Sequence, residues 1–194
     1  MYLIIYGPEG SGKGTQAKLL SEKLNLPVLT SGDLVRSKAE NETTREGKIC
    51  RRALESGHYV PDSVMFKLWQ EMLSSSKAQK GFILDGFPRN LQQAKFLGNT
   101  LADLKISIDY FIYLILSDSQ ARKRLLKRKR KIFAGSQISH DTLEKITRRL
   151  ISYRKKEIQL LDFFKKRNLL LEINADQPVK DVFRSIIESI TKVN

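Results

Sequence analysis

The sequence is short of the residues that form disulfides, zinc sites and membrane spans. Its one cysteine, Cys50, excludes a disulfide within the chain and a cysteine-rich zinc site, and it suits a reducing compartment. Its two histidines, His58 and His140, stand apart, so they form no metal site or triad, and we expect both at the surface. No apolar run approaches the roughly 20 residues that cross a bilayer, which excludes a membrane-spanning protein.

The first ten residues, MYLIIYGPEG, also lack the features of a secretion signal. No basic segment precedes the apolar stretch, and a glycine-rich turn follows it where a cleavage site of small residues would stand. We therefore expect a cytoplasmic protein. The 194 residues, of which 41% are hydrophobic and 29% charged, suit one domain with a core of its own, and we find no internal repeat or low-complexity linker.

Negative charge is scarce relative to positive charge. Lysine and arginine total 35 against 21 aspartate and glutamate residues, which gives a net charge of +14, and most of the excess lies in residues 98–194. Such an excess attracts nucleotides, nucleic acid and anionic membrane surfaces alike. It therefore indicates a polyanionic class of partner and no particular ligand.

Short apolar runs alternate with longer amphipathic stretches along the chain. The runs predicted as strands are residues 2–6, 28–30, 82–85, 110–116 and 169–173, and the stretches predicted as helices are 13–24, 32–75 in several pieces, 91–101, 119–131, 142–167 and the segment after Pro178. Nearly continuous apolar strands are typical of a parallel sheet buried on both faces, so the pattern predicts a three-layer α/β domain. Residues 31–80 and 132–140 interrupt the alternation and are candidates for mobile parts.

Local signals predict how some of these helices begin and pack. Asp141, followed three residues later by Glu144, is expected to cap the helix that starts there. In the last helix, an apolar stripe that starts at Val179 is assigned to the core. Leu125 and Leu126 are expected to pack inward from the basic helix that carries them.

Residues 7–15 read GPEGSGKGT and stand between a predicted strand and a predicted helix. Glycines let the backbone curl so that successive N–H groups face a phosphate, and the helix N-terminus adds the positive end of its dipole. Lys13 would then reach the transferred end of a triphosphate. The alternative is a glycine-rich turn without a ligand, but the glycines, the lysine and the strand-turn-helix context together favour a P-loop.

Two further motifs follow predicted strands, at the edge where open α/β sheets bind ligands. SGDLVR, residues 31–36, ends in Arg36, whose planar guanidinium can pair with a phosphate, although the motif also suits a capped helix start. DGFPR, residues 85–89, begins with Asp85 at a strand end. An acid there suits a role in holding magnesium beside a P-loop, and a turn aspartate is the alternative.

The P-loop has a variant ending, because Gly14 follows Lys13 where serine or threonine is usual and the hydroxyl comes next, at Thr15. This GKGT ending with Gln16, together with SGDLVR, DGFPR and RLLKR, resembles the nucleoside monophosphate kinases, the family of adenylate kinases and UMP/CMP kinases, over nearly the whole chain. The resemblance implies a three-layer P-loop NTPase fold with a five-stranded parallel sheet. It also implies a single domain, residues 1–194, with a helical monophosphate-binding part near 31–60 and a short lid near 129–140.

The resemblance assigns roles to individual residues. ATP would contact Gly10, Ser11, Gly12, Lys13, Gly14, Thr15, Arg128 and Gln177. AMP would contact Ser31, Arg36, Tyr59, Gly86, Arg89, Gln93 and Arg149. The catalytic residues that surround the transferred phosphoryl group would be Lys13, Arg89, Arg128 and Arg149, and Mg²⁺ would be held by Thr15 and, through water, by Asp85. The expected lid lacks the four ligands of a zinc site, so no structural zinc is expected.

The acceptor is inferred from two of these positions. The amide of Gln93 can donate and accept in one plane, which matches the amino and ring nitrogens of adenine. Adenylate kinases carry glutamine there, whereas UMP/CMP kinases typically carry asparagine, with alanine where this chain has Ser31. Both positions favour AMP as the acceptor. An asparagine directly after Arg89, as at Asn90, resembles the pyrimidine kinases instead, so CMP or UMP remains an alternative acceptor.

Two residues depart from the family pattern. Glu9 places a carboxylate in the P-loop, where it would weaken nucleotide binding unless a basic neighbour offsets it. Ile138 stands eleven residues before Arg149, where short-lid relatives carry a phosphate-binding arginine. The missing arginine bears on catalytic efficiency more than on the type of reaction.

The sequence thus predicts a short-lid member of the adenylate kinases, a monomeric enzyme that moves the terminal phosphoryl group of Mg·ATP to AMP and gives two ADP. The rival from another class is a nucleic-acid-binding protein with incidental ATPase activity, because eight of the ten residues 122–131 are basic. That segment has no aromatic side chains on which bases would stack, so we expect neither nucleic acid nor a membrane as a partner.

Overall fold

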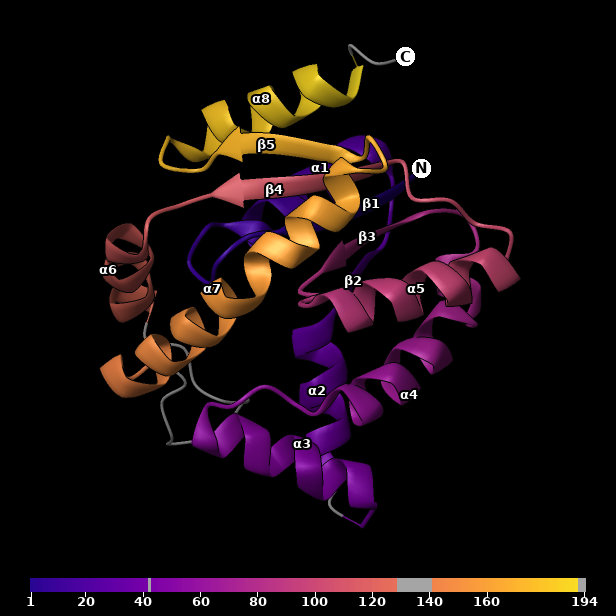
Figure 1. The fold of residues 1–194 in the computed structure, drawn as a ribbon, viewed down its shortest axis with the longest axis vertical. Helices are drawn as coiled ribbons and strands as arrows, with labels where there is room; N and C mark the ends of the chain where they lie inside the picture. Colours follow the sequence, from indigo (N-terminus) through magenta and orange to yellow (C-terminus); the bar gives the residue numbers. More distant parts are fainter. Residues whose placement is uncertain (42, 129–140, 192–194) are drawn as a thin grey trace.

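Five strands form one fully parallel sheet in the order β2-β3-β1-β4-β5 (Figure 1). Their bounds are Tyr2–Tyr6 for β1, Val28–Thr30 for β2, Phe82–Asp85 for β3, Tyr110–Ile115 for β4 and Leu170–Asn174 for β5. The structure is a computed structural model that describes residues 1–41, 43–128 and 141–191. The predicted five-stranded parallel sheet is confirmed, with β4 one residue shorter than expected and β5 shifted by one residue.

The central strand β1 places apolar side chains on both faces of the sheet, and both faces are buried. Leu3 and Ile5 of β1 belong to one apolar cluster, whereas Ile4 and Tyr6 belong to the cluster on the opposite face. Successive side chains of a strand point to opposite faces, so a strand without polar residues needs a cover on each side. Helices supply both covers and complete the three layers.

The helices divide between these two clusters. Their bounds are Lys13–Leu24 for α1, Ser31–Glu40 for α2, Arg45–Ser56 for α3, Asp62–Leu73 for α4, Leu91–Asp103 for α5, Asp118–Arg128 for α6, Leu143–Lys165 for α7 and Val179–Thr191 for α8, with a 3₁₀ turn at Ser76–Ala78. α1 and α8 pack on the Leu3 face, and α4 and α5 pack on the Ile4 face. α7 contributes Leu150 to the first cluster and Leu160 to the second.

Helices α2 and α3 pack on each other and extend away from the sheet, at the end of the molecule opposite α8 (Figure 1). Thr30 caps α2 by accepting from the Asp33 N–H, and Thr44 caps α3 by accepting from the Gly47 N–H. α3 ends at Gly57, whose φ of 73° lies in the left-handed region that glycine tolerates. α2 starts directly after β2, which places Ser31 and Arg36 at the carboxyl edge of the sheet.

Three local expectations are wrong. Thr142, not Asp141, caps α7, because its side chain accepts from the Lys145 N–H. Leu126 is 43% exposed, so only Leu125 packs inward from α6, and Val179 is 50% exposed at the start of α8. The expected lid, residues 129–140, which includes Ile138 and His140, lies outside the described residues.

The helices of the described ranges include none with the length and hydropathy required to cross a bilayer. The longest, α7, carries charged residues along its length.

Candidate active site

The P-loop joins β1 to α1 at the carboxyl edge of the sheet. Gly10 has a φ of +89°, and a Cβ there would lie 2.9 Å from the Ala121 carbonyl oxygen of α6, so only glycine fits. Gly12, with a φ of +94°, precedes the first turn of α1 and leaves its backbone open to the cleft. The local sequence thus bends the chain around the N-terminus of α1, where the helix dipole favours an anion.

Lys13, in the first turn of α1, folds its ammonium back onto the loop. Its Nζ donates to the carbonyl oxygens of Gly7 and Pro8 at 2.8 and 2.9 Å. Burial lowers the pKa of this ammonium, while the nearby carboxylates of Asp85 and Glu9 act in the opposite direction. A phosphate that entered the loop would offer the ammonium a negatively charged acceptor in place of two neutral carbonyls.

The two expected magnesium residues lie at the same edge. Thr15 and Asp85 both line the larger cleft, and a Cβ on Gly14 would stand 3.5 Å from Asp85 Oδ2, so the carboxylate approaches the start of α1. Oxygen donors fit Mg²⁺, which keeps several waters and is commonly bound by few protein carboxylates together with substrate phosphates. Within the described ranges, no three His, Cys, Asp or Glu side chains are grouped to hold a metal on their own.

The larger cleft contains most of the expected ATP residues. Those that line it are Gly10, Gly12, Lys13, Gly14, Thr15, Arg128 and Gln177. Ser11 is buried, and its N–H donates to the Pro8 carbonyl oxygen at 3.1 Å inside the loop. Arg124 also lines the cleft, where it donates to the Ala175 carbonyl oxygen and to Asp176, so this arginine fixes α6 to the segment before α8.

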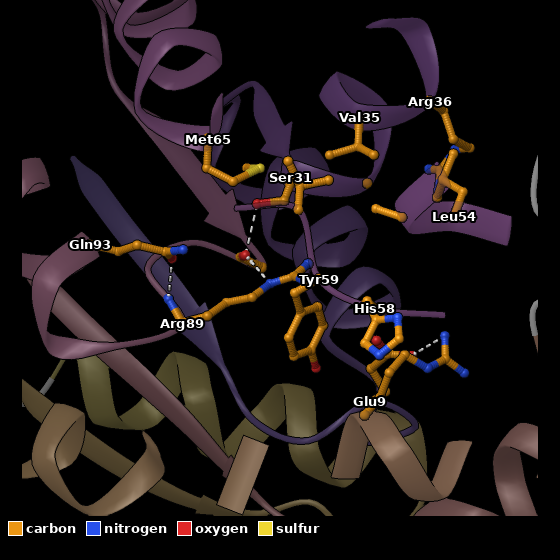
Figure 2. Close-up of a pocket in the computed structure, with 15 residues that line it drawn as sticks. Glu9, Ser31, Val35, Arg36, Leu54, His58, Tyr59, Met65, Arg89 and Gln93 are labelled. Carbon is orange, nitrogen blue, oxygen red and sulfur yellow. Dashed lines mark hydrogen bonds and ion pairs between the residues drawn. The ribbon is translucent and has the colours of Figure 1, made fainter. Parts of the chain in front are cut away.

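A smaller pocket adjoins this cleft and contains every expected AMP residue (Figure 2). These residues are Ser31, Arg36, Tyr59, Gly86, Arg89, Gln93 and Arg149. Apolar side chains from α2 to α4 form its other wall, among them Val35, Leu54 and Met65. Glu9, Arg36 and Arg89 line both the pocket and the cleft, so a ligand in one would meet a ligand in the other.

One carbonyl oxygen fixes two of the pocket's side chains. The Gly86 oxygen accepts from Ser31 Oγ and from Arg89 Nε, both at 2.7 Å, which joins the residues that follow β2 and β3. The Arg89 guanidinium lies 4.5 Å above the ring of Tyr59. Burial and Glu9 raise the pKa of Tyr59 to about 12, so this phenol stays protonated and can donate a hydrogen bond.

Arg36 packs against the backbone of its own helix. A Cβ on Gly32 would lie 3.0 Å from Arg36 Nη1, so glycine leaves room for the guanidinium. Arg36 Nη2 contacts Asp33 Oδ1 at 2.5 Å, and the exposed Asp33 side chain sets its direction. The guanidinium thus stands where pocket and cleft meet.

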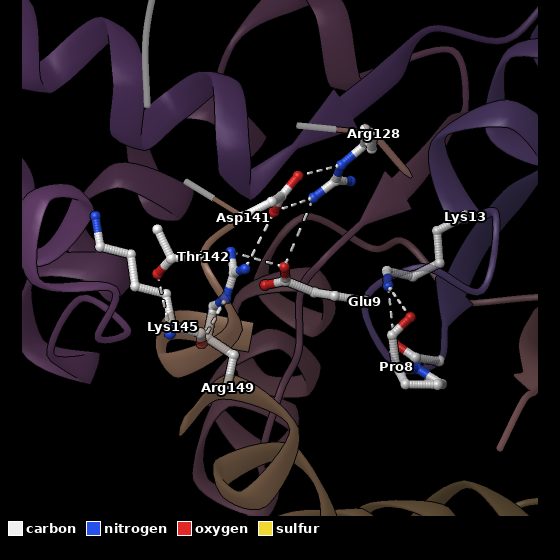
Figure 3. Close-up of polar contacts among 9 residues, drawn as sticks. Pro8, Glu9, Lys13, Arg128, Asp141, Thr142, Lys145 and Arg149 are labelled. Atoms are coloured by element: carbon white, nitrogen blue, oxygen red, sulfur yellow. Dashed lines mark hydrogen bonds and ion pairs between the residues drawn. The ribbon is translucent and has the colours of Figure 1, made fainter. Parts of the chain in front are cut away.

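Two arginines and two carboxylates form a charge cluster beside the P-loop (Figure 3). Arg149 contacts Glu9 Oε2 at 2.9 Å through Nη1 and Asp141 Oδ1 at 3.2 Å through Nη2. Arg128 binds Asp141 with two hydrogen bonds, of 2.8 and 3.0 Å, and its Nη2 lies 4.0 Å from Glu9. Arg149 is 3% exposed, so the carboxylates offset the cost of burying its charge.

Sequence reasoning missed the contribution of Asp141 and His58 to this site, and it left the partners of Glu9 unidentified. Asp141 was expected to cap a helix but binds Arg128 and Arg149. His58 is exposed, as expected, yet it also lines the smaller pocket. The departure at Glu9 is explained by the two arginines, because they are the basic neighbours that such a carboxylate requires. No local pattern indicates the contacts of Glu9, since the two arginines lie more than a hundred positions further along the chain.

The cleft and the pocket adjoin and share Arg36 and Arg89, and further basic side chains line each of them. Phosphoryl transfer requires this arrangement, because its negative charge must be neutralised and aligned with little covalent help from the protein. The fold and site therefore define a P-loop phosphotransferase.

The sequence is similar to those of known adenylate kinases. The model of the adenylate kinase family matches residues 5–169. The adenylate kinase of Thermobifida fusca is 37% identical over 182 residues, covering 94% of each chain, and that of Leptospira biflexa is 37% identical over 188 residues, covering 97% of this chain and 98% of the relative. The adenylate kinase of Cyanothece sp. is 39% identical over 184 residues, covering 95% and 92%.

The chain belongs to the adenylate kinase family. The resemblance inferred from its motifs is confirmed, and so is the class of enzyme, an ATP:AMP phosphotransferase among the nucleoside monophosphate kinases.

Proposed function

We propose that the chain binds Mg·ATP in the larger cleft and AMP in the smaller pocket, and that it transfers the γ-phosphoryl group between them to give two ADP. The observation that carries this proposal is the junction of the two cavities, which share Glu9, Arg36 and Arg89. The residues assigned to ATP line the larger cleft, apart from Ser11, and all those assigned to AMP line the smaller pocket. Arg36, Gly86 and Arg89 line both, and the catalytic residues Arg89, Arg128 and Arg149 come from three separate segments of the chain.

On the donor side, the P-loop N–H groups and the N-terminus of α1 would hold the phosphates of ATP. Lys13 would exchange the carbonyl oxygens of Gly7 and Pro8 for phosphate oxygens. Magnesium enters with ATP and neutralises phosphate charge, with Thr15 and, through water, Asp85 as its protein partners. Gln177, beside the start of α8, would lie near the adenine.

On the acceptor side, Arg36 and Arg89 would bind the AMP phosphate, since a guanidinium pairs with two phosphate oxygens at once. Ser31 and Gln93 would contact the base, with Gly86 and Tyr59 beside the nucleotide. The apolar wall from Val35 to Met65 offers the base a surface free of competing charge.

In the transfer step, an oxygen of the AMP phosphate attacks the γ-phosphorus as the bond to the β–γ bridging oxygen breaks. Lys13, Arg89, Arg128 and Arg149 would stabilise the charge on the moving group and align it in the direction of attack. The attacking oxygen already carries negative charge, so the step requires no general base.

Several expectations remain proposals. The helical pair α2 and α3, in residues 31–60, and the segment 129–140 would close over the substrates and exclude water. The active form would be a monomer. ATP and AMP are intracellular metabolites, which supports a cytoplasmic location.

The test is to incubate the protein with Mg·ATP and, separately, AMP, CMP, UMP, GMP or no acceptor, and to quantify the diphosphates formed. We expect rapid ADP formation that requires AMP, and a loss of at least 100-fold in kcat for Lys13→Met, because that change removes a charge aimed at the transition state. Removing free Mg²⁺ with a chelator should stop the reaction as well.

Preference for CMP or UMP would keep the mechanism and overturn the assignment of the acceptor pocket. ATP hydrolysis at the same rate with and without any acceptor would contradict the proposal itself. Thermal melting of Lys13→Met is the control for folding.

A further inference from the structure

The amide of Gln93 has only one orientation compatible with its two neighbours. Gln93 is 4% exposed in the first turn of α5, and its end faces the smaller pocket (Figure 2). Its Oε1 accepts from the Arg89 backbone N–H at 2.7 Å, and its Nε2 donates to Asp62 Oδ1 at 2.7 Å. A backbone N–H only donates and a carboxylate only accepts. In a flipped amide, Nε2 would therefore face the Arg89 N–H, donor against donor, and Oε1 would face the Asp62 carboxylate, acceptor against acceptor.

The partner carboxylate is itself held in place. Asp62 lies in the first turn of α4, and its second oxygen, Oδ2, accepts from Asn90 Nδ2 at 2.9 Å. Asn90 caps α5 because its Oδ1 accepts from the Gln93 N–H at 2.8 Å. These hydrogen bonds give Asn90 a structural role that is independent of the acceptor base.

The fixed amide offers a defined pattern to a base. An amide oxygen has a second lone pair and an amide nitrogen a second hydrogen, so each atom of Gln93 can make one more bond. Oε1 can accept from an exocyclic amino group, and Nε2 can donate to a neighbouring ring nitrogen. Adenine presents both of these groups side by side. Guanine and hypoxanthine present an oxygen and a ring N–H instead, so both contacts with them would be repulsive.

We propose that Asp62 is a specificity-determining positioning residue: it holds the Gln93 amide in the orientation that selects a 6-aminopurine over a 6-oxopurine as acceptor. This inference rests on the proposed function, in which Gln93 contacts the AMP base. Asp62 does not line the pocket in the described structure and acts through Gln93. The energetic source is the charge-assisted hydrogen bond from Nε2, which is about twice as strong as a neutral one.

The test compares AMP with IMP, two purine monophosphates that differ in the edge read by Gln93. In Asp62→Asn, the new side chain can either accept from or donate to the Gln93 amide, so only the Arg89 backbone N–H still favours one orientation of the amide. We expect the ratio of kcat/KM for AMP to kcat/KM for IMP to fall about tenfold, with KM for ATP unchanged, because a charged acceptor is replaced by a neutral one that tolerates both orientations.

Two further variants make the result decisive. Gln93→Ala should lower the ratio at least as far as Asp62→Asn, since it removes the reading group. Asp181→Asn, which also replaces an aspartate in the first turn of a helix, should leave the ratio unchanged and controls for the loss of helix-end charge. Asparagine retains the size of aspartate and its preference for helix starts, and melting temperatures would verify folding.

Equal loss of activity toward AMP and IMP in Asp62→Asn would assign Asp62 a merely structural role and overturn the inference. An unchanged ratio in Gln93→Ala would overturn it as well. Failure of the proposed function is distinguishable, because the unmodified protein would then show no preference for AMP over the other monophosphates.

Discussion

At the scale of single residues, Glu9 adds a negative charge to the phosphate site. Its carboxylate leaves the P-loop toward Arg149, at 2.9 Å, and lies 4.0 Å from Arg128 (Figure 3). The position is beside the cleft assigned to the triphosphate, so a bound phosphate group would compete with Glu9 for both guanidinium groups and would be repelled by its charge.

We therefore expect Glu9→Gln to bind nucleotides more tightly. The change removes a negative charge from the phosphate site and keeps the shape of the side chain, while Asp141 still holds both arginines. KM for ATP and AMP should fall about fivefold, equivalent to about 1 kcal/mol. Steady-state kinetics at low ionic strength would measure the effect.

A matched control is Glu22→Gln, which removes an exposed carboxylate on α1 that stands 4.0 Å from Lys18. It should leave both KM values unchanged. A higher KM in Glu9→Gln would show that Glu9 preorganises the arginines more than it competes with phosphate, and would contradict this expectation.

At the scale of elements, α7 positions Arg149 and is anchored by a buried carboxylate. Glu157 Oε1 accepts from the hydroxyl groups of Tyr113 on β4 and Tyr153 on α7, both at 2.5 Å, and Arg154 Nη1 donates to Glu157 as well. Arg154 also donates to the Leu116 carbonyl oxygen. Burial and this carboxylate raise the pKa of Tyr113 to about 12, so the phenol remains a donor.

Glu157→Ala should therefore destabilise the fold. The change leaves two buried hydroxyl groups and one guanidinium without their common acceptor, which costs about 3 kcal/mol and lowers Tm by roughly 6–12 °C for a chain of this size. Differential scanning calorimetry would measure the shift, and Glu157→Gln, which keeps one acceptor oxygen, should lose less.

An exposed glutamate on α3, changed in Glu55→Ala, is the control and should move Tm by less than about 2 °C. Equal melting temperatures for Glu157→Ala and the unmodified chain would show that the network contributes nothing to stability.

The elements also show what a sequence can and cannot predict. β1, the P-loop and α1 depend on local patterns, an apolar run, glycines and a helical repeat, and their predicted bounds agree with the structure. The contacts of Gln93 with Asp62 and of Arg149 with Glu9 join residues 31 and 140 positions apart, so only the packed fold brings them together.

Errors arose where a local pattern had two possible meanings. Asp141 fits a capping box, but Thr142 takes that role and leaves the carboxylate for the arginines. Leu126 and Val179 are apolar residues at helix positions that the fold leaves exposed, since a stripe wider than the contact area cannot be buried entirely.

At the scale of the whole molecule, several of the 35 lysine and arginine residues belong to the site and its supports. Lys13, Arg36, Arg89 and Arg128 line the cleft, and Arg154 belongs to the anchor of α7. Guanidinium groups that bind protein oxygens are not arranged to follow a nucleic-acid backbone. The charge that remains on the surface would raise the local concentration of any anion, including nucleotides.

Because these basic side chains bind protein oxygens, we expect the protein to bind nucleic acid weakly. A single-stranded 30-base oligonucleotide should bind with a Kd weaker than about 1 µM at physiological salt, and the affinity should fall steeply as salt rises, because released counterions drive such binding. By contrast, KM for AMP should change less over the same range, since a buried pocket that contacts one phosphate releases few ions. Fluorescence anisotropy and steady-state kinetics in matched buffers would provide the two salt dependences. Tight oligonucleotide binding that persists at high salt, and that AMP fails to displace, would require a nucleic-acid site on the basic surface and a second function for this chain.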